Sequence, residues 1–366
     1  MSNTNVAFFI GDSSAKGGTE RVTIALGNAL SKSINTSIVS LEKTSKPYYN
    51  IEGKVKLYYI NEGSKRTFYG NKINFITRLV SDVIYLIKSI PKVRLYFKNS
   101  TVSHVVSTDT KMALLLLLSS IGLKTKVIAM EHFDYRTPSF LIRMIRIIIY
   151  RYVSAIVILT NEDERFYSKI NKRIFIIPNM VSVSSEQQPN LKSKRIISIG
   201  RLTEQKGFDL LIEAWGKIES TLKDWRLDII GEGHLHDELN LMINNKKLQN
   251  IHLIGFSDDI KSEYLDSSFL VMSSRYEGLG MVLIEALACG LPCISFNCPS
   301  GPSTIINNSV NGYLVNSQDT DALASKMLEL ATDFDKLNVL ASNAKESIRQ
   351  YQEEGVIKKW SVLFDS

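Results

Sequence analysis

Two glutamates in one short segment are the residues of this chain best suited to chemistry. Glu277 precedes a glycine-rich turn, and Glu285 follows eight residues later inside an otherwise apolar helical pattern that Gly290 and Pro292 close. A carboxylate in an apolar helix needs a partner, which is either a basic group of the protein or a ligand hydroxyl. Eight residues of helix span about 12 Å, so these carboxylates are too far apart to share one proton. They suit opposite ends of a long ligand such as a nucleotide sugar.

Two cations follow an expected strand in the same half of the chain. Arg201 and Lys206 lie between a strand expected at 195–199 and a helix expected from about Phe208. Two positive side chains beside a helix N-terminus form a clamp suited to a diphosphate. The alternative is a pair of solvated charges on a surface turn. The acidic balance of this half favours the clamp.

The candidate residues of the first half are less specific. Gly17 and Gly18 precede a helix expected from about Thr19, where exposed N–H groups could hold a phosphate or a sugar hydroxyl. Their spacing differs from GxGxxG, which disfavours a nicotinamide dinucleotide, and a plain turn capped by Thr19 is the alternative. Glu131 and His132 directly follow another expected strand. A lone histidine is more often structural than functional, but ligands bind at strand ends in parallel sheets.

These loops belong to a regular alternation of strands and helices. Short β-branched runs alternate with amphipathic stretches, which indicates parallel sheets wound by crossover helices. The alternation pauses at 181–194, a stretch without periodicity that is typical of a linker. Since 366 residues suit two domains of about 150–200 each, we predict an α/β chain of two doubly wound Rossmann-like domains facing across a cleft. The expected strands cover 6–10, 37–41, 55–60, 103–106, 126–130, 155–159, 174–177, 195–199, 226–230, 251–254, 269–272, 293–296 and 313–315.

The second half resembles the retaining glycosyltransferases of the GT-B class usually called family 4, or group 1. Its matching motifs are Gly200-Arg201 with Lys206-Gly207, Ile229-Ile230-Gly231-Glu232-Gly233, Leu253-Ile254-Gly255-Phe256, Glu277 to Glu285, Ser300-Gly301-Pro302 and Asn311-Gly312-Tyr313-Leu314-Val315. The first half matches less closely, and its motifs fit members that build bacterial cell-surface polysaccharides on lipid carriers. These are Gly17-Gly18-x-Glu20-Arg21, Glu131-His132 and Ile177-Pro178-Asn179. One departure is Ile305-Ile306-Asn307-Asn308, where relatives often carry an acidic residue.

The resemblance implies a role for each matching residue at the nucleotide end of a donor. Arg201 and Lys206 would bind the donor diphosphate. Glu285 would hold the ribose hydroxyls, and the backbone around Phe256 would contact the base. The pair Gly17-Gly18 would approach the diphosphate and the acceptor.

At the sugar end, the resemblance implies a carboxylate, a histidine and backbone donors. Glu277 would contact the donor sugar near its C3 and C4 hydroxyls. The N–H groups of Gly278, Leu279 and Gly280 would contact the sugar or a phosphate. His132 would lie across the cleft near the donor sugar and the reacting centre.

The activity implied by the resemblance is transfer of a hexose or N-acetylhexosamine from a UDP-sugar to a saccharide carried on a polyprenyl diphosphate. The anomeric configuration would be retained, and the product would be a bacterial surface polysaccharide such as O-antigen or capsule. GT-B enzymes generally use no metal ion, so we expect neither a metal nor a cofactor. UDP is preferred over GDP on family frequency alone. The donor sugar, the linkage, the exact acceptor and the oligomeric state are not predicted.

The resemblance also assigns the domains. Residues 1–185 would form the acceptor-side domain and 186–348 the donor-binding domain. Residues 349–366 would form a C-terminal helix that crosses back to the first domain, as in relatives.

Charge is unevenly divided along the chain. Through Ser185 the chain has 26 basic and 12 acidic residues, and after it 18 basic and 25 acidic. Two basic amphipathic stretches with interleaved aromatics, 65–98 and 140–152, are typical of segments that bind anionic membrane surfaces. Solvated helix faces are the alternative. We expect a cytoplasmic protein, peripheral at the inner face of the cytoplasmic membrane. Nucleic acid is disfavoured because no recognition motif is present.

Two other function classes remain open. A sugar-nucleotide 2-epimerase of GT-B architecture would bind UDP-sugars but would be expected to show different acid–base residues. A non-catalytic nucleotide-sugar-binding subunit is disfavoured because the glutamates, the cations and the histidine are all present. The three cysteines, Cys289, Cys293 and Cys298, lack zinc-ligand spacing and are expected to be buried thiols in a reducing cytosol. We predict neither a signal peptide nor a transmembrane helix.

Overall fold

The chain forms two compact units in the computed structural model, which describes residues 4–62 and 75–366 without the side chains at 62, 75, 76, 78 and 79. Unit 1 comprises Met1–Met180 with Glu353–Ser366, and unit 2 comprises Val181–Gln352. The first division falls five residues before the predicted boundary at 185. The return to unit 1 falls at Glu353, four residues after the predicted position.

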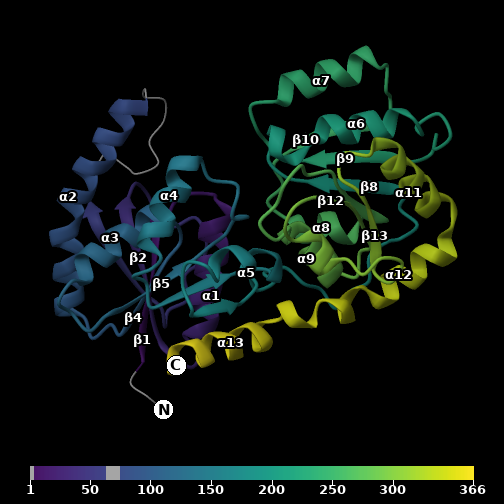
Figure 1. Ribbon diagram of the computed structural model, residues 1–366. Coiled ribbons are helices and arrows are strands. Elements are labelled where there is room, and N and C mark those ends of the chain that lie inside the picture. Colours follow the sequence, from purple (N-terminus) through teal and green to yellow (C-terminus); the bar gives the residue numbers. More distant parts are fainter. Residues whose placement is uncertain (1–3, 63–74) are drawn as a thin grey trace. The chain divides into compact units, whose positions relative to one another are not determined.

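Unit 1 is built on a parallel sheet (Figure 1). Its strands are β1 (Asn5–Asp12), β2 (Asn35–Lys43), β3 (Lys56–Glu62), β4 (His104–Ser107), β5 (Lys126–Met130), β6 (Ala155–Ile158) and β7 (Ile174–Ile176). They pair in the order β3-β2-β1-β4-β5-β6-β7, and the order reverses between β1 and β4. Every residue of β4 and β6 is buried, as expected of strands covered on both faces.

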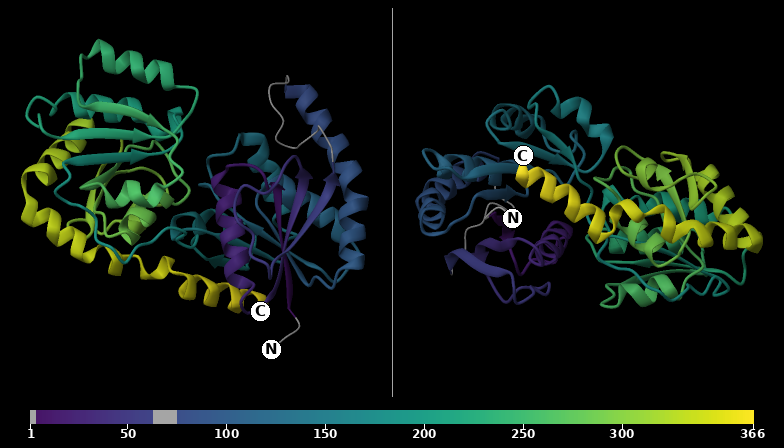
Figure 2. Two further views of the ribbon diagram at one scale, coloured as in Figure 1. Left: turned by 180° about the vertical axis from the view of Figure 1, so that it is seen from behind. Right: turned by 90° about the horizontal axis from the view of Figure 1, so that it is seen from below.

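Helices cover both faces of this sheet. They are α1 (Gly18–Leu30), α2 (Phe75–Asn99), α3 (Thr110–Ser120), α4 (Phe140–Ile149), α5 (Asn161–Tyr167) and α13 (Glu353–Asp365). Because successive strand residues point to opposite faces, Phe9 of β1 packs in the core with α2 and α3, and Phe8 packs in the core with α1 and α13. Trp360 of α13 meets the Phe8 ring edge-on, with centroids 5.7 Å apart. Figure 2 shows α13, in yellow, beside α1.

Unit 2 repeats the same winding. Its strands are β8 (Arg195–Ile199), β9 (Arg226–Ile230), β10 (Ile251–Gly255), β11 (Phe269–Met272), β12 (Cys293–Asn297) and β13 (Gly312–Asn316). All pairs are parallel, in the order β10-β9-β8-β11-β12-β13. Its helices are η1 (Glu204–Lys206), α6 (Phe208–Gly216), α7 (His236–Asn245), α8 (Ile260–Leu265), α9 (Met281–Ala288), α10 (Pro302–Ile305), α11 (Thr320–Thr332), α12 (Phe334–Ser347) and η2 (Arg349–Tyr351).

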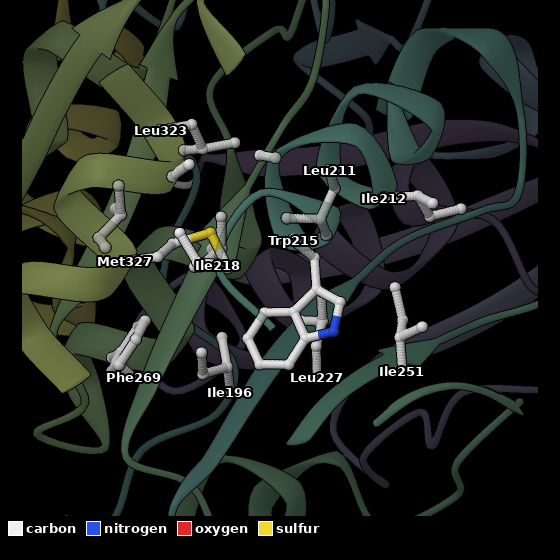
Figure 3. Packing of buried hydrophobic residues seen from close by; sticks show 14 of the residues in the cluster. Ile196, Leu211, Ile212, Trp215, Ile218, Leu227, Ile251, Phe269, Leu323 and Met327 are labelled. Atoms are coloured by element: carbon white, nitrogen blue, oxygen red, sulfur yellow. The ribbon is translucent and has the colours of Figure 1, made fainter. Parts of the chain in front are cut away.

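The core of unit 2 centres on Trp215 of α6. Its indole is fully buried among side chains from β8, β9 and α11, including Ile196, Leu227 and Met327 (Figure 3). This layer anchors the sheet whose strand ends carry the unit 2 candidates. The predicted class, two doubly wound parallel α/β units, is confirmed, and every expected strand overlaps an observed one.

Candidate functional site

The loops that follow β8, β9 and β10 are joined through glycine backbones. The Gly200 N–H donates to the Ile230 carbonyl at 3.0 Å, and the Gly231 N–H donates to the Gly255 carbonyl at 2.7 Å. Gly231 has φ +146°, and a Cβ there would lie 1.9 Å from the Gly200 carbonyl oxygen. Only glycine permits so close an approach. These motif glycines let three loops meet at the carboxyl edge of the sheet, where doubly wound folds bind ligands.

Lys206 and Glu277 contact each other directly at this edge. Lys206 Nζ donates to Glu277 Oε1 at 2.6 Å, and Ser274 Oγ donates to the same oxygen at 2.6 Å. Both charged side chains are largely buried. Burial strengthens charge interactions, so the attraction between these two side chains is stronger than that of an exposed pair. An anion that reached Lys206 would therefore share it with a carboxylate.

Hydrogen bonds fix the loop of Lys206 against the loop that follows β11. Ser273 Oγ donates to the Lys206 carbonyl at 3.0 Å. Gln205 Nε2 donates to the Tyr276 carbonyl at 3.0 Å, and the Arg275 N–H donates to the Gln205 carbonyl at 2.8 Å. The position of the lysine relative to the glutamate is thus set by main-chain contacts as well as by their own ion pair.

Arg275 is a structural residue of this site that the sequence analysis missed. Its guanidinium donates to both carboxylate oxygens of Asp209, at 2.8 and 2.6 Å, and to the Glu204 carbonyl at 2.9 Å. Burial opposes ionisation of Asp209, but the hydrogen bonds from Arg275 outweigh it and lower the pKa of that carboxyl. An aspartate in the first turn of α6 was the available signal, though it does not specify its partner.

The N-terminus of α9 is held by a tight backbone contact. Gly278, Leu279 and Gly280 are buried, and Gly280 caps the helix with φ +89°. Gly301 has φ +106°, and a Cβ there would lie 2.2 Å from the Leu279 carbonyl oxygen. Because the first N–H groups of a helix lack intrahelical acceptors, this end suits an anion or a sugar hydroxyl. That is the chemistry predicted for residues 278–280.

Glu285 has hydroxyl partners inside the protein. Its side chain lies in α9 and the residue is 1% exposed. Ser182 Oγ donates to Oε1 at 3.0 Å, and the Tyr264 hydroxyl donates to Oε2 at 3.1 Å. These partners are hydroxyls of the protein itself, whereas the sequence suggested a basic group of the protein or a hydroxyl of a ligand. Ser182 and Tyr264 had no sequence signal, because they come from an irregular segment and from α8.

Arg201 and Phe256 lie at the same edge but on its surface. Arg201 follows β8 and is exposed, unlike Lys206 five residues later. Phe256 follows β10 and is 49% exposed, with Ile254 similarly exposed beside it in sequence. The structure therefore pairs one predicted cation tightly with the protein and leaves the other accessible.

In unit 1, His132 directly follows β5. The residue is 9% exposed, and its Nε2 has no hydrogen-bond partner within the described residues. Burial lowers the pKa of the imidazole to about 4, so it is neutral at pH 7. A neutral imidazole can donate or accept one hydrogen bond. The unpaired nitrogen is unusual, since buried polar atoms are ordinarily bonded.

Gly17 and Gly18 begin α1 as predicted, but the alternative cap was wrong. The N-cap is Gly17 and no side chain caps the helix, so Thr19 does not serve as cap. A Cβ on Gly17 would lie 2.0 Å from Glu20 Oε2, whereas Gly18 is exposed and has open space around it. Burial raises the pKa of the Glu20 carboxyl. The glycine pair leaves the start of α1 accessible.

The two basic stretches differ from their predicted form. In α4, Arg146 is buried rather than exposed, because it pairs with Glu131. In α2, Tyr85 and Phe97 pack inward, and the exposed apolar side chains among those that the structure describes in this helix are aliphatic. The exposed apolar residues of these helices and of the turn after α4 are Val80, Val83, Ile84, Ile87, Leu95, Phe140, Leu141, Met144, Ile148 and Tyr152. The predicted Lys65, Arg66, Phe68, Tyr69 and Lys72 lie outside the described residues.

Other predicted features concern metals, membranes and thiols. Across 4–62 and 75–366, no three His, Cys, Asp or Glu side chains gather as a metal-ion site would require. In the same ranges no helix combines the length and apolarity needed to cross a bilayer. Cys289, Cys293 and Cys298 are buried free thiols, as expected.

Known structures place this architecture in the GT-B class. Staphylococcus aureus TarM, solved as a variant with fondaparinux, alpha-GlcNAc-glycerol and UDP, aligns with TM-score 0.79 and 18% identity, covering 99% of this chain and all of TarM. Anabaena HepE, solved with UDP and glucose, aligns with TM-score 0.78 and 15% identity, covering 99% of this chain and all of HepE. Both likenesses concern the fold.

The sequence relationship is more specific. Residues 183–347 match the family model of glycosyl transferases group 1. The chain is 28% identical to the amylovoran biosynthesis glycosyltransferase AmsD of Erwinia amylovora, over 96% of this chain and 97% of AmsD. It is 26% identical to the GalNAc-alpha-(1->4)-GalNAc-alpha-(1->3)-diNAcBac-PP-undecaprenol alpha-1,4-N-acetyl-D-galactosaminyltransferase of Campylobacter jejuni, over 95% and 94%. The match over residues 183–347, together with these relatives, confirms the predicted resemblance to the group 1 glycosyltransferases.

Proposed function

We propose that this glycosyltransferase moves a hexose or N-acetylhexosamine from a UDP-sugar to a saccharide on a polyprenyl diphosphate, retaining the anomeric configuration. The pathway is bacterial surface polysaccharide synthesis. The names of AmsD and of the Campylobacter jejuni relative support the pathway, and the latter name includes an undecaprenol-diphosphate acceptor. UDP in the TarM and HepE structures supports the nucleotide.

The observation that carries this proposal is the buried Lys206–Glu277 pair at the carboxyl edge of unit 2. In the proposed reaction the bond between the sugar C1 and the diphosphate oxygen breaks. The acceptor hydroxyl oxygen bonds to C1 on the same face, and its proton passes to the leaving phosphate oxygen. Lys206 and exposed Arg201 stabilise the negative charge on the departing diphosphate, together with the α9 N-terminus.

The remaining candidates take the roles that the family resemblance implies. Glu277 holds the donor sugar, and the N–H groups at 278–280 bind the sugar or a phosphate. Glu285 accepts hydrogen bonds from the ribose. A ribose hydroxyl then replaces the Ser182 or the Tyr264 hydroxyl at this carboxylate. His132 contacts the reacting donor sugar as a neutral imidazole. No metal ion takes part, so treatment with EDTA leaves the rate unchanged.

Replacing Lys206 tests the phosphate role. In a radiolabelled assay with UDP-sugars and membrane extract, Lys206→Ala should lower transfer about 10²–10³-fold, since it removes one charge from the leaving group. Lys217→Ala is the matched control, because Lys217 also pairs with a carboxylate of unit 2, at 2.7 Å from Asp321. Undiminished transfer by Lys206→Ala would refute the assignment. If the native protein releases a sugar epimerised at C2, the epimerase is favoured. If the native protein gives no product, the non-catalytic subunit is favoured.

We also propose that unit 1 docks on the anionic inner face of the cytoplasmic membrane. The exposed apolar side chains of α4, with Phe140 71% exposed, are the support. Arg143 and Arg151 lie near them in sequence, and basic residues beside apolar ones favour anionic lipid surfaces.

Vesicle flotation tests this docking. Wild-type protein should float with vesicles containing anionic lipid and remain behind with neutral ones. Ile148→Glu should weaken flotation, because it adds a negative charge to the exposed face of α4. Val339→Glu, an equally exposed apolar position on α12, should not. Equal binding of the native protein to neutral and anionic vesicles would contradict the electrostatic contribution.

A further inference from the structure

Arg146 of α4 is a buried cation with partners in several elements of unit 1. Its Nη2 lies 3.2 Å from Glu131 Oε2, and its Nη1 donates to the Tyr167 hydroxyl at 2.9 Å. Nε donates to Thr110 Oγ1 at 3.2 Å, and Nη1 also donates to the Tyr135 carbonyl at 3.3 Å. One guanidinium thus ties the loop after β5 to α3, α4 and α5.

Aromatic side chains enclose this ion pair. The rings of Tyr135, Tyr150 and Tyr167 lie 5.7, 5.9 and 5.8 Å from the Arg146 guanidinium carbon. The Tyr150 hydroxyl donates to Glu131 Oε1. Burial raises the pKa of the Glu131 carboxyl, and the neighbouring guanidinium opposes that rise. A buried pair of this kind adds little stability over apolar residues of the same size, so its presence favours a role in fixing one conformation.

The conformation it fixes is that of the loop carrying His132. Glu131, the residue before the histidine, is held by Arg146 and Tyr150. Tyr135 lies three residues after His132. Its carbonyl accepts a hydrogen bond from Arg146, and its N–H donates to Asp163 Oδ1 at 3.2 Å. The imidazole Nε2 has no hydrogen bond of its own among the described residues. Its place is therefore set by the loop, and the loop by its anchors.

We propose that Arg146 is a positioning residue which, through Glu131 and the Tyr135 carbonyl, holds His132 where it meets the donor sugar. This inference rests on the proposed function, in which His132 contacts that sugar. Because Arg146 is 2% exposed, it acts through these neighbours and not by contact with the substrate. Its role differs from that expected of it on a basic membrane-facing stretch.

The first test follows His132 by NMR of protein labelled with ¹³C-histidine, with the His132 signal assigned by its absence in His132→Gln. In the native protein this titration should give an imidazole pKa of about 4, because burial lowers it. Arg146→Gln should let water reach the loop and move this pKa up by about one unit or more, toward the ordinary value. Arg94→Gln is the matched control, because Arg94 also donates to two backbone carbonyls of unit 1, those of Ser119 and Ile121. It should leave the His132 pKa unchanged.

The second test separates positioning from stability. The double variant Glu131→Leu with Arg146→Met replaces the ion pair by apolar groups, so it should lower the unfolding temperature less than Arg146→Gln, which leaves the Glu131 carboxylate buried without its cation. If Arg146 positions His132, this folded variant still shows the raised His132 pKa. Its kcat for donor hydrolysis falls about 10²-fold, with KM for the donor changed less than about twofold. Arg146→Lys keeps the positive charge but lacks the planar set of guanidinium N–H donors, so it should recover part of kcat.

An unchanged His132 pKa and kcat in the folded double variant would overturn the proposal. Failure of the proposed function gives a different result. In that case the native protein consumes no nucleotide sugar, while the NMR comparison still reports whether Arg146 sets the environment of His132.

Discussion

At the scale of single residues, the Lys206–Glu277 pair links two opposing requirements of the candidate site. The cation must be available to a diphosphate, yet it lies 2.6 Å from a carboxylate that is itself largely buried. The carboxylate holds the Lys206 side chain in place before any ligand arrives. It also competes with the phosphate oxygens for the same ammonium group. Glu277 should therefore weaken binding of the nucleotide alone while it contributes to recognition of the complete donor.

Neutralising Glu277 tests this competition. Glu277→Gln should tighten binding of UDP about fivefold, or about 1 kcal/mol, because Lys206 no longer faces a negative partner. The same variant should transfer sugar more slowly than the native protein. Isothermal titration with UDP measures the first effect and a transfer assay the second. Glu213→Gln, which removes a carboxylate paired with Lys246 on the surface of unit 2, is the control. Weaker UDP binding by Glu277→Gln would contradict the competition.

Residue partners were the least predictable part of the site. The sequence marked Lys206, Glu277 and Glu285 by type and spacing, but it did not pair the first two, which lie 71 positions apart. Ser182 and Tyr264 reach Glu285 from distant segments with no periodic signal. Such contacts depend on how loops pack at a sheet edge, and hydrophobic periodicity carries no information about that packing.

At the scale of elements, glycines decide how closely the site loops approach one another. Gly301, with φ +106°, lets its loop rest against the Leu279 carbonyl at the start of α9. This contact sets the direction of the helix N-terminus. Residues 277–280 are buried next to it, and Met281 begins the helix. The motif glycine is therefore a requirement of backbone geometry.

Substituting this glycine should move the helix start. Gly301→Ala places a Cβ 2.2 Å from the Leu279 oxygen in a backbone conformation that alanine disfavours, so the two loops must separate. We expect lower stability by about 1–3 kcal/mol and at least tenfold weaker UDP binding. Urea unfolding and titration with UDP are the measurements. Gly53→Ala has open space and should change neither. Native UDP affinity in a folded Gly301→Ala protein would show that the contact does not aim α9.

Elements were more predictable than partners. Parallel strands are buried on both faces, so their apolar runs located every expected strand to within a few residues. Helix α4 shows the limit of the same reasoning. Its sequence is amphipathic, with Arg143 and Arg146 three residues apart on one side, and this pattern predicts that the arginine side faces solvent. Arg146, expected among the surface cations, points inward because Glu131 and three tyrosines supply its partners there.

At the scale of the whole molecule, the two units differ in how they hold ionisable groups. Unit 1 carries most of the net positive charge, and it also buries two histidines, His104 and His132. Burial lowers the pKa of each to about 4; nearby Lys126 and Arg173 reinforce the effect at His104. In unit 2 the large depression is that of the Glu329 carboxyl, to about 2, which is caused by hydrogen bonds from Lys326 and Lys336. The two units should therefore respond to acid in different pH ranges.

Unit 1 should lose stability first as the pH falls from 7 to 5. A histidine whose pKa is near 4 when folded and near 6.5 when unfolded binds more protons in the unfolded state. Its contribution to the free energy of unfolding is therefore fully present above pH 6.5 and declines toward pH 4. At pH 5 each of the two histidines should lower the free energy of unfolding by about 2 kcal/mol. Asp163 acts oppositely, because burial raises its pKa to about 6, and it offsets about 1 kcal/mol. The buried carboxyls of Glu20, Glu42 and Glu131 act in the same direction, because burial raises their pKa values as well. The stabilising contribution of Glu329 in unit 2 is complete above about pH 4.5 and is lost only below it. The measurement is hydrogen exchange with mass spectrometry, corrected for intrinsic exchange rates. Strands β1, β4 and β5 should exchange faster at pH 5 than at pH 7, and β8 and β11 should change little. His104→Gln should reduce this acid sensitivity, and equal loss of protection in both units would refute the assignment to the buried histidines.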